Sequence, residues 1–266
     1  MVRVCILDLG RLECDRGWQV AVPHPSTISD PHPERERMSL PVIASLVESR
    51  GKLILFDTGC HPDAMRGHWS ATWADYFAFS VTPEQDLVEQ LALAGHAPDE
   101  VTDVVLSHLH MDHSGNVGLF PDAKIWVHRR EVEFALAECL TVADYVGPYV
   151  SDDWLLPGVK WQFVQEHAAV TSEVSLIALA GHTPGTLGMQ VEAGSRTFVF
   201  PSDAMYAAEN LGPPVRLPGS VYDSLGFRKT AEWLMFMRDS LGALIVFPHD
   251  PEQFASLSTA PYWYEA

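Results

Sequence analysis

Three histidines and one aspartate fall within six residues in the stretch Ser107-His108-Leu109-His110-Met111-Asp112-His113-Ser114-Gly115. A packed core has little use for so many imidazoles side by side, because each buried polar group needs a partner. Metal ions are partners that imidazole and carboxylate share. A surface loop that happens to be rich in histidine is the competing interpretation, and it leaves the aspartate and the spacing unexplained. The stretch therefore predicts a metal site.

The residues on either side predict that this stretch is a loop at the end of a strand. Residues 101–106 form a short apolar run, and Gly115, Asn116 and Gly118 interrupt any continuation of it. Along such a loop, His108 and His110 would face the same way, while Asp112 and His113 turn toward a neighbouring position. We therefore expect two adjacent metal positions.

Composition favours a globular enzyme with a small neutral substrate. The 266 residues are within reach of one large domain, which we expect to span 1–266, and 47% hydrophobic with 20% charged residues is ordinary for a folded chain. The 17 Lys and Arg against 35 Asp and Glu give a formal net charge of −18, with no basic stripe. Such a surface disfavours nucleic acids, anionic membranes and polyanionic substrates.

The character of residues 1–10, the short apolar stretches and the scattered cysteines predict a cytoplasmic protein. Residues 1–10 carry Arg3 and Asp8, so we expect no secretion signal there, and no apolar stretch approaches the length of about eighteen residues that a membrane span needs. The cysteines are scattered without metal-binding or disulfide spacing, which predicts reduced thiols at Cys5, Cys14, Cys60 and Cys139.

Apolar runs and turn residues predict the order of elements. We expect a hairpin of strands 2–9 and 18–22, a second hairpin of strands 41–48 and 52–57, and irregular segments at 23–33, 60–80 and 145–157. Helices are predicted from Thr82 to about Leu93, over 129–140 and over 226–241. Further strands are predicted at 101–106, 124–127, 160–164, 174–180, 187–191, 196–200 and 244–247. Strands in runs with helices between them favour an α+β fold, an αββα sandwich of two mixed sheets faced by helices.

Three more metal-binding side chains follow predicted strands. His182, Asp203 and His249 are each weak signals alone, but with the first stretch they make five histidines and two aspartates, enough for two metal ions with open positions. We assign His108, His110 and His182 to one ion and Asp112, His113 and His249 to the other, with Asp203 bridging them. The remaining histidines are expected to be surface or loop residues: His24, His32, His61, His68, His96, His128 and His167.

In these seven candidate ligands the chain resembles the metallo-β-lactamase superfamily. The His-x-His-x-Asp-His motif stands at residues 108–113, and the later ligands match His182, Asp203 and His249. The resemblance implies the αββα fold over essentially the whole chain. Other segments resemble the quorum-quenching N-acyl homoserine lactonases, namely Asp203-Ala204-Met205-Tyr206, Tyr222-Asp223-Ser224-Leu225-Gly226-Phe227 and His249-Asp250-Pro251-Glu252-Gln253-Phe254.

The lactonase resemblance implies a reaction and a site. It implies a homodimeric hydrolase with two divalent ions, zinc or else iron, cobalt or manganese, which opens an N-acyl homoserine lactone by attack of a metal-bridging hydroxide. Tyr206 would contact the lactone carbonyl and stabilise the oxyanion, and Asp112 would pass a proton to the leaving ring oxygen. Trp18, Tyr76 and Phe77 would wall the acyl chain, although core packing is the competing interpretation for these aromatic residues.

Two other functions stay open at this point. Another ester, thioester or β-lactam hydrolase of the same superfamily would carry the same metal ligands. A metal-bound sensor without turnover would also retain them, and it would bind metal without hydrolysing any acyl substrate.

Overall fold

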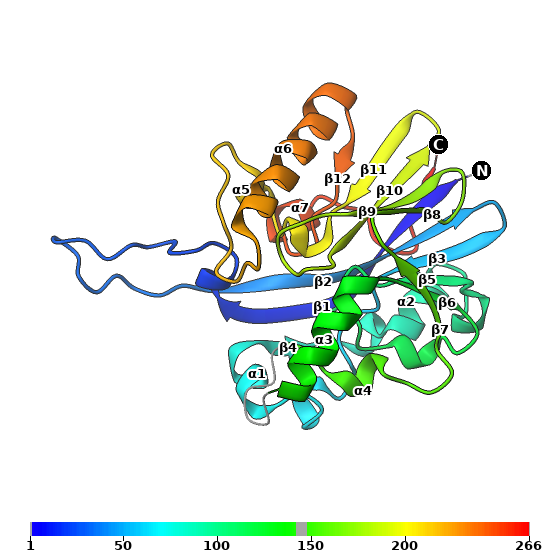
Figure 1. The fold of residues 1–266 in the computed structure, drawn as a ribbon, viewed down its shortest axis with the longest axis horizontal. Helices are drawn as coiled ribbons and strands as arrows, with labels where there is room; N and C mark the ends of the chain where they lie inside the picture. The colour runs from blue at the N-terminus through cyan, green and yellow to red at the C-terminus, as the bar shows by residue number, and fades with distance from the viewer. Residues whose placement is uncertain (1, 142–147, 266) are drawn as a thin grey trace.

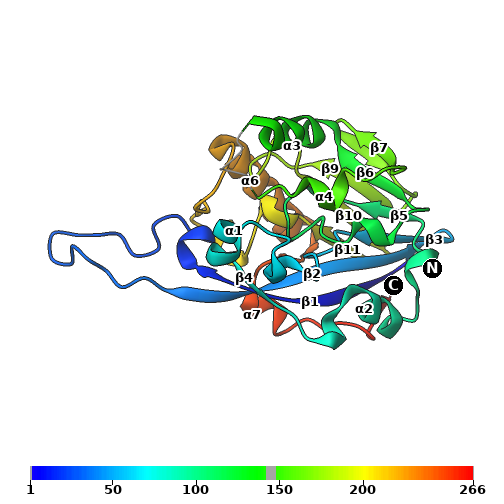
Figure 2. The same ribbon diagram turned by 90° about the horizontal axis from the view of Figure 1, so that it is seen from below.

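The computed structural model describes residues 2–141 and 148–265. Two mixed β-sheets face each other, and helices cover their outer faces (Figure 1; Figure 2). The larger sheet has the order β13 (Tyr264–Glu265), β1 (Arg3–Asp15), β2 (Arg37–Ser49), β3 (Lys52–Phe56), β5 (Asp103–Val105), β6 (Lys124–His128) and β7 (Lys160–Val164), with β4 (Ala78–Ser80) paired to β1. The smaller sheet has the order β12 (Leu244–Ile245), β11 (Arg196–Phe200), β10 (Leu187–Ala193), β9 (Val174–Ala178) and β8 (His167–Ala169). This arrangement confirms the predicted αββα sandwich.

The helices divide between the two outer faces. The face of the larger sheet carries α1 (Ala71–Tyr76), α2 (Leu87–Leu93), α3 (Arg129–Thr141) and α4 (Ser151–Trp154). The face of the smaller sheet carries α6 (Ser224–Leu241), near α5 (Ala208–Leu211). The short α7 (Pro251–Phe254) contacts β2. Within the described ranges, no helix is both long and apolar enough to cross a membrane.

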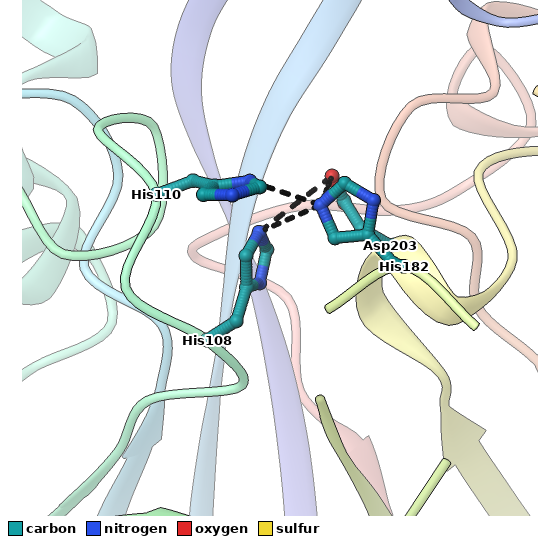
Figure 3. A group of neighbouring side chains, drawn as sticks. All are labelled: His108, His110, His182 and Asp203. Carbon is teal, nitrogen blue, oxygen red and sulfur yellow. Dashed lines mark hydrogen bonds and ion pairs between the residues drawn. The ribbon is translucent and has the colours of Figure 1, made fainter. Parts of the chain in front are cut away.

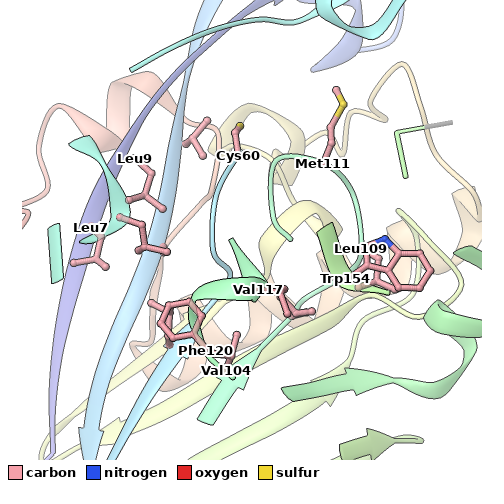
Figure 4. Packing of buried hydrophobic residues seen from close by; sticks show 14 of the residues in the cluster. Leu7, Leu9, Cys60, Val104, Leu109, Met111, Val117, Phe120 and Trp154 are labelled. Carbon is pink, nitrogen blue, oxygen red and sulfur yellow. The ribbon is translucent and has the colours of Figure 1, made fainter. Parts of the chain in front are cut away.

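Buried side chains that point alternately into two different cores explain why the sheets lie in the middle. In β3, Leu53 and Leu55 join the core beneath the helices, whereas Ile54 and Phe56 join the core between the sheets. Successive side chains of a strand point to opposite faces, so a strand that is apolar at every position must be covered on both sides. Figure 4 shows the core under the helices, where Leu7, Leu9 and Trp154 pack.

The first predicted hairpin is wrong. β1 continues through Gly10 to Asp15 and pairs with β2. Residues 18–22 form no strand, because Trp18 ends a single 3₁₀ turn at Arg16–Trp18 and irregular chain follows it. A glycine directly after an apolar run suggests a strand end, but Gly10 sits at φ +111° where the register shifts between Asp8 and Arg11. An added Cβ there would lie 2.6 Å from Ser80 O, so the glycine accommodates a β-bulge and the close approach of β4.

The loop between β1 and β2 projects from the body of the molecule (Figure 1). The predicted irregular segment 23–33 lies in this loop, and its residues are mostly exposed. The second predicted hairpin is confirmed, since β2 and β3 pair antiparallel from Ser45 opposite Phe56 to Ser49 opposite Lys52.

Several other boundaries differ from prediction. The helix expected from Thr82 begins at Leu87, because the Asp86 side chain accepts from Val88 N and caps a new helix after one 3₁₀ turn. The segment 60–80 was expected to be irregular but contains α1 and β4. Short strands β8 and β13 were not predicted. Of the segment 145–157, residues 145–147 lie outside the described residues, and the rest contains α4.

Candidate metal centre

Loops at the ends of neighbouring strands meet at one edge of the sandwich. In the larger sheet β3, β5 and β6 are parallel, so the residues that follow them, Asp57, the 107–115 loop and the start of α3, lie side by side. In the smaller sheet β9, β11 and β12 also share one direction, and they lead to His182, Asp203 and His249. The bond from Leu187 N to Ser107 O, at 2.7 Å, joins the two sheets at this edge.

One group of side chains converges from both sheets (Figure 3). His182 Nε2 lies 3.1 Å from His108 Nε2 and 2.9 Å from His110 Nδ1. Asp203 Oδ2 lies 3.4 Å from the same His182 nitrogen and 3.8 Å from His108 Nε2. All four side chains are nearly or fully buried.

A second group lies on the other side of Asp203. His113 Nε2 and His249 Nε2 are each 3.6 Å from Asp112 Oδ2. Asp203 Oδ1 lies 3.3 Å from His113 Nε2 and 3.2 Å from His249 Nε2. One oxygen of Asp203 therefore faces each group, which is the arrangement expected of a bridging carboxylate.

Hydrogen bonds on the far side of the rings fix which nitrogen faces inward. His249 Nδ1 lies 2.9 Å from Pro41 O, and a carbonyl can only accept, so Nδ1 carries a proton. His108 Nδ1 contacts Ser107 Oγ at 2.9 Å, and this hydroxyl itself donates to Asp57 Oδ2. Partners of this kind orient histidines that bind metal and leave Nε2 free as the ligand atom.

Asp57 organises the loop beneath the centre. Its carboxylate accepts from Ser107 N at 2.8 Å and lies 2.9 Å from His113 Nδ1. Its backbone has φ +62°, a conformation that non-glycine residues rarely adopt and that costs energy. The only sequence signal for Asp57 is its place at the end of the predicted strand 52–57, just before Thr58 and Gly59.

Glu131 is a second organising carboxylate that the sequence analysis missed. It is fully buried at the start of α3 and accepts from Leu109 N at 3.1 Å, Tyr149 Oη at 3.1 Å and Thr183 Oγ1 at 2.6 Å. Burial raises the pKa of Glu131 and these donors oppose the rise. Gly185 allows the close approach, because a Cβ there would lie 2.4 Å from Glu131 N. Glu131 thus ties the 107–115 loop to the loop that carries His182.

The electrostatics fit a pair of cations. Burial lowers the pKa of His108 and His110, and it lowers that of His182 to about 4, so these rings are neutral and able to coordinate. For His113 and His249, burial also favours the neutral form, but the carboxylates of Asp203 and Asp112 outweigh it and raise the pKa.

Two buried atoms at the centre of the site, His113 Nε2 and Asp203 Oδ1, lie 3.3 Å apart, yet neither makes a hydrogen bond of good geometry with any described residue. Atoms left in this state are costly unless something else binds them. Five imidazoles and two carboxylates aimed at a common space are a donor set suited to divalent transition metals. The residues present therefore fit metal binding.

A pocket of about 150 Å³ opens onto the centre. Its floor includes His110, Asp112, His182, Asp203 and His249, and its walls are Leu12, Trp18, Gln19, Leu40, Trp73, Phe77, Met111, Pro148, Tyr206 and Ser220. Most of the wall is apolar, while the metal-binding groups gather at one end. Such a pocket suits a substrate with a polar reacting group and an apolar tail.

The structure places the three predicted wall residues differently. Trp18 and Phe77 line the pocket, with ring centroids 5.1 Å apart. Tyr76 packs on Trp18 at 5.9 Å but is 46% exposed and is not among the lining residues. Trp73, to which we assigned no role, lines the pocket and is otherwise buried in the core.

The expectation for the remaining histidines is partly wrong. His128 is buried in β6, where its Nδ1 accepts from Arg130 N at 3.0 Å. His61 and His68 do lie in loops, as expected, but they are partly buried and gather near Asp153. The reason is tertiary: α4 brings Asp153 to two histidines that are far from it in sequence.

The fold and the His/Asp centre define a class of protein. Residues 40–249 match the family model of the metallo-beta-lactamase superfamily, and the chain belongs to that superfamily. Within it, the predicted resemblance to N-acyl homoserine lactonases is confirmed. The N-acyl homoserine lactonase AiiB of Agrobacterium fabrum is 34% identical over 266 residues, covering 96% of each chain.

Other similar proteins and solved structures are also lactonases. An N-acyl homoserine lactonase of Bacillus thuringiensis is 28% identical over 84% of this chain and 87% of its own length. A solved N-acyl homoserine lactone hydrolase, with the product N-hexanoyl-L-homoserine bound at its catalytic metal centre, superposes with a TM-score of 0.82 at 25% identity, over 98% of both chains. The dizinc lactonase AidC, 20% identical with a TM-score of 0.68 over 94% of this chain and 88% of its own, shares the fold.

Proposed function

We propose that this protein is a quorum-quenching lactonase that hydrolyses the ester bond of N-acyl homoserine lactones. The observation that carries the proposal is Asp203, whose two oxygens each face one group of metal-binding residues at the end of an apolar pocket. Similarity over nearly the whole chain to lactonases supports the substrate class.

The centre would hold two divalent ions, zinc or alternatively iron, cobalt or manganese. His108, His110 and His182 would bind one, Asp112, His113 and His249 the other, and Asp203 both. When bound, such ions polarise a carbonyl and activate water as a nucleophile near neutral pH. The protein's part is to hold this geometry, through Asp57 and Glu131 beneath the loops.

Tyr206 would act as the hydrogen-bond donor to the lactone carbonyl. Its hydroxyl lies 2.9 Å from His182 Nδ1. With His182 Nε2 facing the centre, Nδ1 carries the proton and donates to the Tyr206 oxygen, which leaves the phenol O–H free to donate into the pocket. Burial raises the pKa of Tyr206 well above its ordinary value, so the phenol keeps its proton.

Asp112 would take a proton from the attacking water and pass it to the ring oxygen as that oxygen leaves. It is the most exposed of the candidate ligands in the second group, with 14% of its side chain exposed, and it lines the pocket. A general acid must reach the leaving atom, and this position at the pocket floor meets that need.

The acyl chain would lie against Trp18 and Phe77, with Tyr76 at the rim. These lactones carry no charge, so the strongly acidic surface does not oppose their entry. We further propose that residues 1–266 form one domain, that the protein is a homodimer, and that it works in the cytoplasm. Light scattering after gel filtration tests the dimer.

A proton-release assay on acyl homoserine lactones with chains of four to twelve carbons tests the activity. Turnover should be abolished in Asp203→Ala, with His167→Ala as a matched control at an exposed histidine. Thioester and β-lactam substrates belong in the same panel. Preference for either of these over every lactone would refute the lactonase and favour another hydrolase of the superfamily, and metal binding without any turnover would indicate a sensor.

A further inference from the structure

A second set of potential metal ligands lies outside the candidate centre. His61 follows β3, His68 precedes α1, and Asp153 lies on α4. Their ligand atoms all lie within 4.8 Å of one another. His68 Nε2 is 2.5 Å from Asp153 Oδ1, and the His61 ring stacks on the His68 ring with centroids 3.7 Å apart. None of the three belongs to the set around Asp203.

The Asp153 carboxylate lacks sufficient partners. Its side chain is fully buried, and Oδ2 has no hydrogen-bond partner within the described part of the chain. Burial raises the pKa of Asp153 to about 6, against the opposing effect of His68. A buried carboxylate oxygen without a partner is unfavourable, and a bound cation would remove that cost.

We propose that His61, His68 and Asp153 bind one divalent transition-metal ion of the zinc type. Two imidazoles and one carboxylate are a common set of three protein ligands, and water can complete the coordination. Asp153 and His68 are already in contact. His61 is partly exposed, and its Nδ1 accepts only a local bond from Asp63 N at 3.0 Å. Coordination requires this ring to turn out of the stack and, where Nδ1 is the ligand atom, to replace that bond.

The position of the site gives the ion a structural role. The segment with His61 and His68 leads into α1, whose Trp73 lines the pocket. Asp153 closely follows Pro148 in the sequence, and Pro148 also lines the pocket. An ion at this point would brace the two pocket walls against each other, without contacting the pocket floor.

Native mass spectrometry during zinc titration of the full chain tests the proposal. Wild-type protein should bind one more zinc ion than His61→Ala or His68→Ala. His32→Ala, which removes an exposed histidine from the loop between β1 and β2, should match the wild type. Because the result is a difference of one ion, it holds whether or not the other centre binds two ions or the protein hydrolyses lactones.

Equal zinc counts for wild type and both variants would overturn the proposal. Should the variants not fold, diethyl pyrocarbonate labelling of the wild type with peptide mapping answers the same question. Zinc should protect His61 and His68 while leaving His32 reactive. Unchanged labelling of His61 and His68 at saturating zinc would equally overturn the site.

Discussion

Replacing Tyr206 with phenylalanine removes one hydroxyl and keeps the ring. The ring packs against His182 and His249, with centroids 5.4 Å and 5.8 Å away, and Phe preserves these contacts. The hydroxyl has two proposed functions, which are to donate to the lactone carbonyl and to accept from His182 Nδ1 at 2.9 Å. The substitution should therefore reduce catalysis and weaken metal binding, with little effect on packing.

The size of each effect follows from its chemistry. Loss of one oxyanion donor typically costs about 10²- to 10³-fold in kcat, and metal ions that share the same oxygen would absorb part of this loss. We expect kcat/KM for lactones to fall at least about tenfold, which corresponds to about 1.4 kcal/mol. Loss of a hydrogen bond behind a ligand histidine typically weakens metal affinity by about 10- to 100-fold.

The two effects separate when metal is in excess. At saturating zinc, Tyr206→Phe should contain as much metal as the wild type and show a similar melting temperature, yet remain slow on every acyl chain length. Tyr262→Phe is a suitable control, because that ring is 51% exposed and lies outside the pocket lining. Metal content by elemental analysis and kcat/KM by proton release are the two measurements.

Full activity of metal-saturated Tyr206→Phe would refute the donor function. Loss of activity that recovers completely as zinc is raised would show that Tyr206 acts only through His182.

Four further predictions follow from the geometry. Asp203→Ala should release both metals together, since one oxygen faces each group, and a variant that keeps one ion by elemental analysis would contradict the bridge. Trp18→Ala should raise KM for long-chain lactones more than for short ones. An equal rise in KM at every chain length would indicate that Trp18 only packs in the core. Glu131→Gln should destabilise the fold by about 2–4 kcal/mol in chemical denaturation, because an amide nitrogen then faces buried N–H and O–H donors. In chelator, Asp153→Asn should gain stability relative to the wild type as pH rises from 4 to 7, by up to about 3 kcal/mol. The pKa of Asp153, about 6 when folded, exceeds its unfolded value, so ionisation through this range opposes folding of the wild type only.

Residue types and spacing were enough to predict which side chains gather at the centre. Four of the ligands fall within six residues and the other three follow apolar runs, so local pattern locates them, and the structure brings all seven together. The sandwich was also predictable, because strands such as β3 are apolar on both faces. The ligand roles themselves stay predictions until metal is measured.

The groups that support the centre could not be predicted, because their function depends on contacts between distant segments. Asp57 and His113 are 56 residues apart, and Glu131 and Thr183 are 52 apart. The extent of β1 beyond Gly10 could not be predicted for a related reason. A glycine inside an apolar run reads as a strand end, and only the approach of β4 shows that it is a bulge. The grouping of Asp153 with His61 and His68 could not be predicted either, because these residues are far apart in the sequence.

The order of the strands has a consequence for synthesis of the chain on the ribosome. β1, which precedes the other described strands, pairs with β13, and Ile6 bridges to Thr259. The half of the centre that lies on the smaller sheet likewise arrives late, since His249 follows β12. A nascent chain stalled after the first sheet would hold His108, His110, Asp112 and His113 without their partners. Completion of the centre and closure of the sheet edge are thus both postponed until His249 and β13 have left the exit tunnel.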